Sequence, residues 1–164
     1  TVNILAGKQP EDADLLPCLN TLSVNLKMAC HMLTQHQIQP VFEMINGTDM
    51  PRFLIQNIAQ AQEMLEAVQI PALKMQYDCY HMAMMGEDVM HALKENIDWI
   101  GHIQFADCPG RHQPDTAQIE FADMFKWLDQ SSYTGFIAAE YKPQSHSSQS
   151  FAWKEKYFPS KHTH

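Results

Sequence analysis

The chain has 164 residues, 45% of them hydrophobic, which supports one folded core and leaves too little sequence for two comfortable domains. Its 19 acidic and 11 basic residues give a formal net charge of −8, which argues against a nucleic-acid surface because phosphate binding needs a basic face. No apolar stretch approaches about 18 residues, so the sequence predicts no membrane span, and no signal peptide is recognisable.

Hydrophobic periodicity predicts strands and helices that alternate along the chain. The predicted strands lie at 2–6, 41–45, 74–78, 100–106 and 136–141. The predicted helices lie at 12–36, 51–68, 87–99 and 119–128, with a last short helix in the aromatic segment 151–158. This alternation implies a parallel sheet covered by helices. A doubly wound open sheet and part of an eight-stranded barrel both fit the order.

The four cysteines are widely spaced and form no Cys-x-x-Cys pair. We therefore expect reduced thiols and a cytoplasmic protein. The first residue is Thr1 rather than Met, and the chain opens directly on a predicted strand, which suggests a longer parent protein.

Four short apolar segments within the predicted strands each end in one oxygen-bearing side chain: Glu43, Asp78, Gln104 and Glu140. They are 35, 26 and 36 residues apart, about the length of a strand–helix–strand unit. The carboxyl ends of parallel strands emerge at one rim, so we expect these side chains to converge there. Carboxylate and amide oxygens suit a hard divalent ion such as Mg²⁺ or Mn²⁺, which would relieve their repulsion. Alternatively, each acidic residue is solvated or caps a helix.

Other polar residues near these strand ends are candidates for binding a substrate. His81 lies just beyond the third strand, and Arg111 and His112 lie in the polar loop after the fourth. An arginine fork suits a carboxylate, because it donates two parallel hydrogen bonds. Lys8, just past Gly7, offers a second cation. The alternatives are a structural histidine for His81 and solvated loop residues for the cations. No phosphate-binding glycine loop is present, and we expect no organic cofactor.

Taken together, four segments of the sequence closely resemble the hydroxypyruvate isomerase family: 41–46, 77–82, 100–112 and 139–143. That family belongs to the xylose isomerase-like superfamily of (β/α)₈ TIM barrels. The resemblance runs from Val2 to about Trp153 and implies that the chain supplies strands four to eight of such a barrel. It therefore implies a partial barrel domain at 1–158, followed by a polar tail at 159–164.

The resemblance also implies a reaction, the interconversion of hydroxypyruvate and 2-hydroxy-3-oxopropanoate through an enediolate. Glu43 and Glu140 match the paired proton donors and acceptors of the family. A divalent metal ion would be held by Glu43, Asp78, Gln104 and Glu140, while His81 and Arg111 would position the hydroxy or keto acid. A ketose epimerase or isomerase of the same superfamily is the alternative enzyme, although that branch is expected to have His where Gln104 stands.

A five-stranded piece of a barrel leaves two unpaired sheet edges and exposes an apolar interior. Three explanations stay open at this point. The chain belongs to a longer protein, or further copies complete the barrel as a homo-oligomer, or the product is a catalytically inactive fragment that acts only as a subunit.

Overall fold

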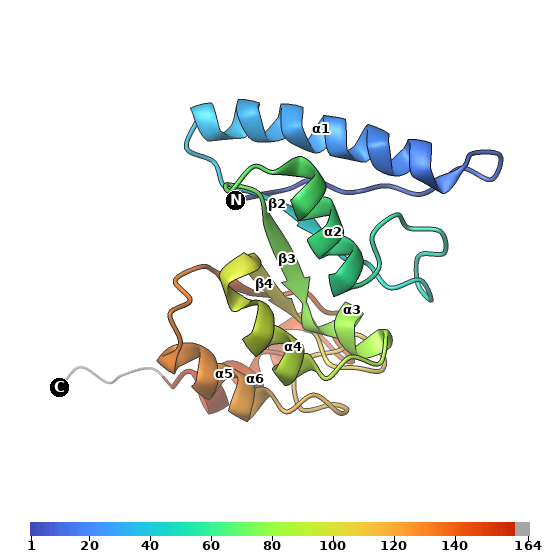
Figure 1. Ribbon diagram of the computed structural model, residues 1–164. Coiled ribbons are helices and arrows are strands. Elements are labelled where there is room, and N and C mark those ends of the chain that lie inside the picture. The colour runs from blue at the N-terminus through green and yellow to red at the C-terminus, as the bar shows by residue number, and fades with distance from the viewer. Residues whose placement is uncertain (160–164) are drawn as a thin grey trace.

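The computed structural model describes residues 1–159 as a sheet of five parallel strands with helices between them (Figure 1). Residues 160–164, which make up most of the tail expected at 159–164, lie outside the described residues. The strands are β1 (Val2–Asn3), β2 (Pro40–Glu43), β3 (Lys74–Asp78), β4 (Ile100–Phe105) and β5 (Ile137–Ala139). The α-helices are α1 (Leu15–Gln35), α2 (Ile58–Val68), α3 (Cys79–Met84), α4 (Val89–Asn96), α5 (Phe121–Gln130) and α6 (Ala152–Tyr157). Two short 3₁₀ helices are η1 (Ile97–Trp99) and η2 (Ser147–Gln149).

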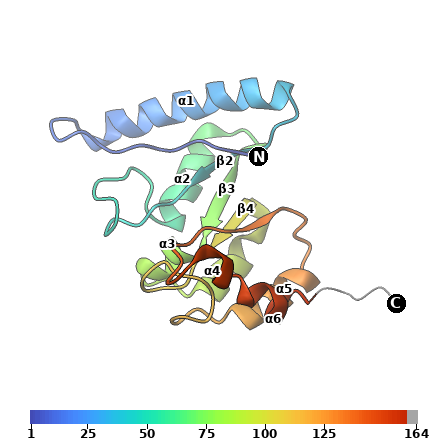
Figure 2. The same ribbon diagram turned by 180° about the vertical axis from the view of Figure 1, so that it is seen from behind.

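The spatial order of the strands decides between the two sheet types that the sequence allowed. The order is β1-β2-β3-β4-β5, and every neighbouring pair is parallel. A doubly wound sheet reverses its strand order at a switch point, whereas a barrel adds each strand beside the preceding one. The partial-barrel prediction is therefore confirmed. The views from front and back agree that α1 and α2 lie toward one end of the sheet and α4 to α6 toward the other (Figures 1 and 2).

The two faces of the sheet differ in chemistry because successive side chains of a strand point to opposite sides. One face is apolar and packs in the main core with the helices; it includes Phe42, Met75, Tyr77, Ile103 and Phe105. Polar side chains alternate with these along the same strands, among them Asn3, Glu43, Gln76, His102 and Gln104. The second face is therefore the polar interior of the partial barrel, and it leads to the strand ends. The apolar interior expected from the sequence is wrong, because these polar side chains alternate with the core residues along the strands.

Several predicted elements differ from the observed ones at their ends. The helix predicted from 51 begins only at Ile58, because the side chain of Asn57 caps it by accepting the N–H of Gln60 at 3.0 Å. The preceding residues pack irregularly instead, and Ile45 donates its N–H to the carbonyl of Ile55. The outer strands are shorter than predicted, with β1 and β5 spanning only two and three residues.

Within residues 1–159, no helix combines the length and apolar character that crossing a bilayer would require. All four cysteines are free thiols, and three of them are buried: Cys30, Cys79 and Cys108. Their state agrees with the reduced thiols expected from the sequence.

Candidate active site

The strand ends meet around one cavity of about 640 Å³. Glu43 is the last residue of β2 and Asp78 the last of β3, while Glu140 follows β5 directly. The register places Asp78 opposite Gln104 on β4. The cavity is lined by Glu43, His81, Gln104, Arg111 and Glu140 together with Asn3, Leu5, Ile45, Asp49, Met50, Gln76, Tyr80, Gly110 and Lys142. The structure thus brings most of the residues singled out from the sequence to one place.

Glu43 is almost completely buried at this rim, with 5% of its surface exposed. Its Oε2 accepts a hydrogen bond of 2.8 Å from the amide of Asn3 on β1. Burial raises the pKa of Glu43, although hydrogen bonds from Asn3 and Gln76 work in the opposite direction. A buried carboxylate with a raised pKa is suited to taking up and returning a proton near neutral pH.

Asp78 is fully buried and serves two purposes. Its Oδ1 accepts the N–H of Tyr80 at 2.9 Å and so caps α3, while its Oδ2 lies 3.4 Å from Nη2 of Arg111. Burial raises the pKa of Asp78 to about 7; the guanidinium of Arg111 lowers it, and the carboxyl of Glu43 raises it further. The site therefore holds a carboxyl group whose charge is poorly compensated.

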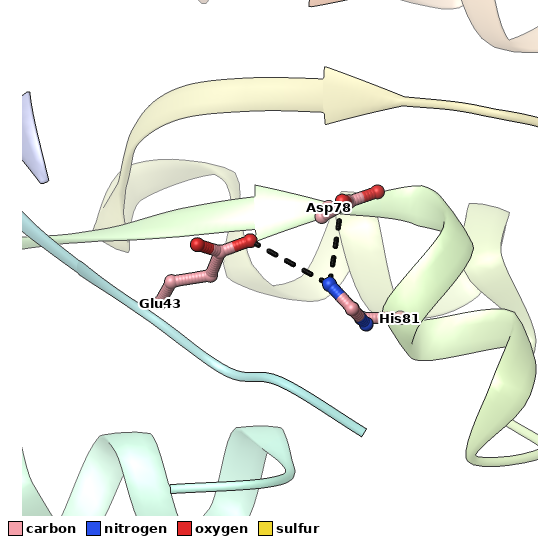
Figure 3. A group of neighbouring side chains, drawn as sticks. All are labelled: Glu43, Asp78 and His81. Carbon is pink, nitrogen blue, oxygen red and sulfur yellow. Dashed lines mark ion pairs between the residues drawn. The ribbon is translucent and has the colours of Figure 1, made fainter. Parts of the chain in front are cut away.

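His81, on α3, points its Nε2 toward both carboxylates, 3.9 Å from Oε1 of Glu43 and 3.7 Å from Oδ2 of Asp78 (Figure 3). Its Nδ1 lies 2.7 Å from the side-chain amide of Asn46 and 3.4 Å from the backbone N–H of Asn46. A backbone N–H can only donate, so Nδ1 accepts, and the proton of the neutral ring resides on Nε2. Burial and the nearby Arg111 lower the pKa of His81 to about 4, so the ring is neutral at pH 7. His81 thus presents a neutral N–H donor to the cavity.

One ligand atom each of Glu43, Asp78 and His81 lies within 4.8 Å of the others, a spacing that could hold a metal ion. The two buried carboxylates fit a hard divalent cation, because a cation would compensate the charge that burial disfavours. His81 fits less well. The nitrogen it turns toward the carboxylates carries a proton in the tautomer set by Asn46 and has no free electron pair to donate.

The other two residues expected to bind the metal each have a partner within the protein. Oε1 of Gln104 accepts a hydrogen bond of 2.7 Å from the amide of Gln76. Oε2 of Glu140 accepts one of 2.7 Å from Nη2 of Arg111, and the Glu140 side chain is 53% exposed. The guanidinium of Arg111 therefore bridges Asp78 and Glu140, and it also lies 5.1 Å from the ring centre of Tyr80.

Two of the residues expected to bind substrate lie outside the lining of the cavity. Lys8 is exposed and forms an isolated antiparallel bridge with Phe53. His112 turns its Nδ1 to the carbonyl of Lys142 at 2.7 Å. In this structure His112 contributes to the contact between the Arg111 loop and the segment after β5.

Sequence reasoning did not identify the polar residues that hold the site in place. Asn3 supports Glu43, while Asn46 and Asp49 support His81 and Tyr80 through a chain of hydrogen bonds of 2.7–3.0 Å. Asn3 could have been noticed, because it is a polar residue between Val2 and Ile4 in an apolar strand. Asn46 precedes Gly47, a pair typical of turns, and nothing local links it to a histidine 35 residues away.

A family model described as the xylose isomerase-like TIM barrel matches residues 1–157. The chain belongs to this family. Among curated members, it is 34% identical to 2-oxo-tetronate isomerase of Cupriavidus necator over 156 residues, which are 95% of this chain and 60% of the relative. It is 35% identical to hydroxypyruvate isomerase of Escherichia coli, again over 95% of this chain and 60% of the relative. The chain thus spans about 60% of the length of these two curated relatives.

Solved structures of other proteins share the fold. A structure described as an AP endonuclease of family 2 from Brucella melitensis superimposes with a TM-score of 0.88 at 27% identity. The match covers 94% of this chain and 60% of that one. A 3-keto-D-glucoside 4-epimerase from E. coli gives a TM-score of 0.78 at 22% identity over 90% of this chain and 57% of the other, a likeness of fold alone.

Proposed function

We propose that this protein acts in an isomerase that interconverts hydroxypyruvate and 2-hydroxy-3-oxopropanoate. The observation that carries the proposal is the meeting of Glu43, Asp78, Glu140 and Arg111 at one rim of the parallel sheet. Identity of 35% to hydroxypyruvate isomerase of E. coli over nearly the whole chain supports the choice of reaction. We expect it to work in the cytoplasm on a small hydroxy or keto acid.

The reaction moves hydrogen between adjacent carbons of the substrate. A base removes a proton from C3 of hydroxypyruvate to form an enediolate, and an acid returns a proton to C2, while the oxygen proton passes from the C3 hydroxyl to the C2 oxygen. We assign these two roles to Glu43 and Glu140. Burial raises the pKa of Glu43, which favours proton exchange near neutral pH.

Arg111 and His81 would orient the substrate. The guanidinium of Arg111 already binds two carboxylates of the protein, those of Asp78 and Glu140, and its fork suits the substrate carboxylate equally well. The Nε2–H of His81 would donate a hydrogen bond to the oxygen on which negative charge develops, and the neutral ring is a weaker acid than an imidazolium would be.

A divalent ion, Mg²⁺ or Mn²⁺, would be held mainly by Glu43 and Asp78, with Gln104 and Glu140 completing the set. When bound, it would polarise the substrate carbonyl and stabilise the enediolate charge. In the present arrangement Arg111 occupies oxygens of Asp78 and Glu140.

The similarity to 2-oxo-tetronate isomerase favours a second candidate substrate. A 2-oxo-tetronate shares with hydroxypyruvate a carboxylate, an adjacent ketone and a hydroxyl on the next carbon, and it has one carbon more. The same glutamates and Arg111 would serve both acids. A longer ketose lacks the carboxylate that Arg111 would bind, so the epimerase alternative is less well supported by this site.

The test compares the purified protein with its Glu43→Gln and Glu140→Gln variants on hydroxypyruvate and on 2-oxo-tetronate, while light scattering measures the oligomeric state. We expect turnover of at least one acid, and losses of at least about a thousandfold in kcat in both variants with unchanged circular dichroism. Substantial turnover in either variant would reject its assigned role. An inactive monomer would support the fragment that acts only as a subunit, whereas an active oligomer would support completion of the barrel by further copies.

A further inference from the structure

One buried carboxylate near the site takes no part in the chemistry described above. Asp107 follows β4 by two residues and is completely buried. No lysine or arginine pairs with it among the described residues. Its charge is instead compensated by backbone N–H groups, an arrangement that stabilises a carboxylate when several donors converge on it.

Five backbone N–H groups donate to the two oxygens of Asp107. Oδ1 accepts from Cys108 and Gln118 at 2.9 Å and from Ile119 at 3.0 Å. Oδ2 accepts from Thr116 at 2.9 Å and Ala117 at 2.8 Å. The carboxylate thereby fastens the start of the loop 108–119 to its end.

The backbone of Asp107 also holds the middle of this loop. Its N–H donates to the carbonyl of His112 at 2.9 Å, and its carbonyl accepts the N–H of Arg111 at 3.1 Å. The carbonyl of Arg111 in turn accepts the N–H of Lys142 at 2.7 Å, beyond β5. Arg111 is thus held from both sides, between the end of β4 and the segment that carries Glu140.

The backbone of Arg111 needs such support because its φ is +56°. Residues with a β-carbon rarely adopt this left-handed conformation, and it persists where surrounding contacts enforce it. From this conformation the guanidinium reaches Asp78 and Glu140.

We propose that Asp107 is the positioning residue of the site: its carboxylate folds the loop 108–119 so that Arg111 is presented to the substrate carboxylate. The part of this inference that concerns the substrate rests on the proposed function. The part that concerns the shape of the loop rests only on the hydrogen bonds described above. Asp107 itself is not among the residues that line the cavity.

The test is Asp107→Asn. The amide keeps one acceptor oxygen, but its NH₂ group replaces the other oxygen and faces backbone N–H groups that then have no acceptor. Asp115→Asn is the matched control, since Asp115 lies in the same loop and its side chain binds Lys156 and Tyr157 instead. We expect Asp107→Asn to raise KM for hydroxypyruvate about tenfold, the effect of one lost charge-assisted hydrogen bond, with kcat changed less than about threefold. Asp115→Asn should leave both constants unchanged.

A chemical readout follows Arg111 without using activity. The chain has two arginines, Arg52 and Arg111, so mass spectrometry after phenylglyoxal treatment can compare their rates of modification. Asp107→Asn should accelerate modification of Arg111 several-fold and leave Arg52 unchanged. Equal acceleration at both would show that Asp107 supports the whole fold, and no change at Arg111 would show that it does not place this residue; either result overturns the proposal.

If Asp107→Asn does not fold, hydrogen exchange of the unmodified protein decides the matter. The five N–H groups bound to Asp107 should exchange slowly and together, as one cooperative unit. Rapid, independent exchange would overturn the proposal. Should the unmodified protein turn over neither acid, the proposed function fails, while labelling and exchange still decide the role of Asp107 in the loop.

Discussion

Asp78→Asn should make the metal-free protein more stable while it removes activity. The amide has the shape of the protonated carboxyl group, and its oxygen can still accept the N–H of Tyr80 that caps α3. It lacks the negative charge that burial disfavours at this position. The substitution therefore separates the effect of the Asp78 charge on the stability of the fold from its effect on activity.

The size of the effect follows from the pKa of Asp78, which is raised from 3.8 to about 7. Ionising this group in the folded chain is penalised, so stability falls as the pH rises from about 4 to about 7 and stays low above that. At 1.36 kcal/mol for each pKa unit, the penalty is about 4 kcal/mol at pH 8 and less than half of that at pH 5. Allowing for relaxation around the amide, we expect a gain of about 2 kcal/mol at pH 8, or roughly 4–8 °C in Tm.

Thermal unfolding in EDTA at pH 8 and pH 5 provides the measurement. Asp49→Asn is the control, because hydrogen bonds from Asn46 and Tyr80 lower the pKa of Asp49. Its charge therefore stabilises the fold above its unfolded pKa, and the control should lower Tm at pH 8. A fall in Tm on Asp78→Asn, or a gain that is larger at pH 5 than at pH 8, would refute the reasoning about its buried charge.

Two further outcomes test the cation and the core. Chelation should lower isomerase activity at least about tenfold, because the proposed site gathers carboxylates whose charge a cation would compensate. Adding Mn²⁺ or Mg²⁺ should restore the activity. Activity that EDTA does not change would exclude the cation. Leu26 on α1 is fully buried and Met28 is 60% exposed, so Leu26→Ala should lower the free energy of unfolding by about 3 kcal/mol and Met28→Ala by less than about 0.5 kcal/mol. Urea denaturation measures both, and similar losses would contradict the packing of α1.

The sequence predicted helices and strands well where the hydrophobic periodicity extends over a long segment. The helix expected at 12–36 is α1, which packs against the core through the buried side chains of Leu22, Leu26 and Cys30. The short helix α3 was missed because it is only six residues long and starts immediately after β3, where an Asp78 cap replaces any separating turn. Periodicity also could not choose between an open sheet and a barrel, since strand order depends on long-range pairing.

At the site, the strand-end rule identified Glu43 and Asp78, which lie close together. The orientation of His81 could not be predicted, because it depends on Asn46 from another strand end. The bridging position of Arg111 depends on a loop whose folding is governed by the Asp107 carboxylate, a contact that no spacing along the chain reveals.

Although β1 is short, its one polar residue affects the site directly. Asn3 belongs to a two-residue strand at the margin of the sheet, attached on one side through β2, yet it donates a hydrogen bond to Glu43. Separation of β1 from β2 would remove that bond and leave the glutamate easier to protonate. The acidity of Glu43, to which we assign proton transfer, therefore depends on how stably β1 pairs with β2.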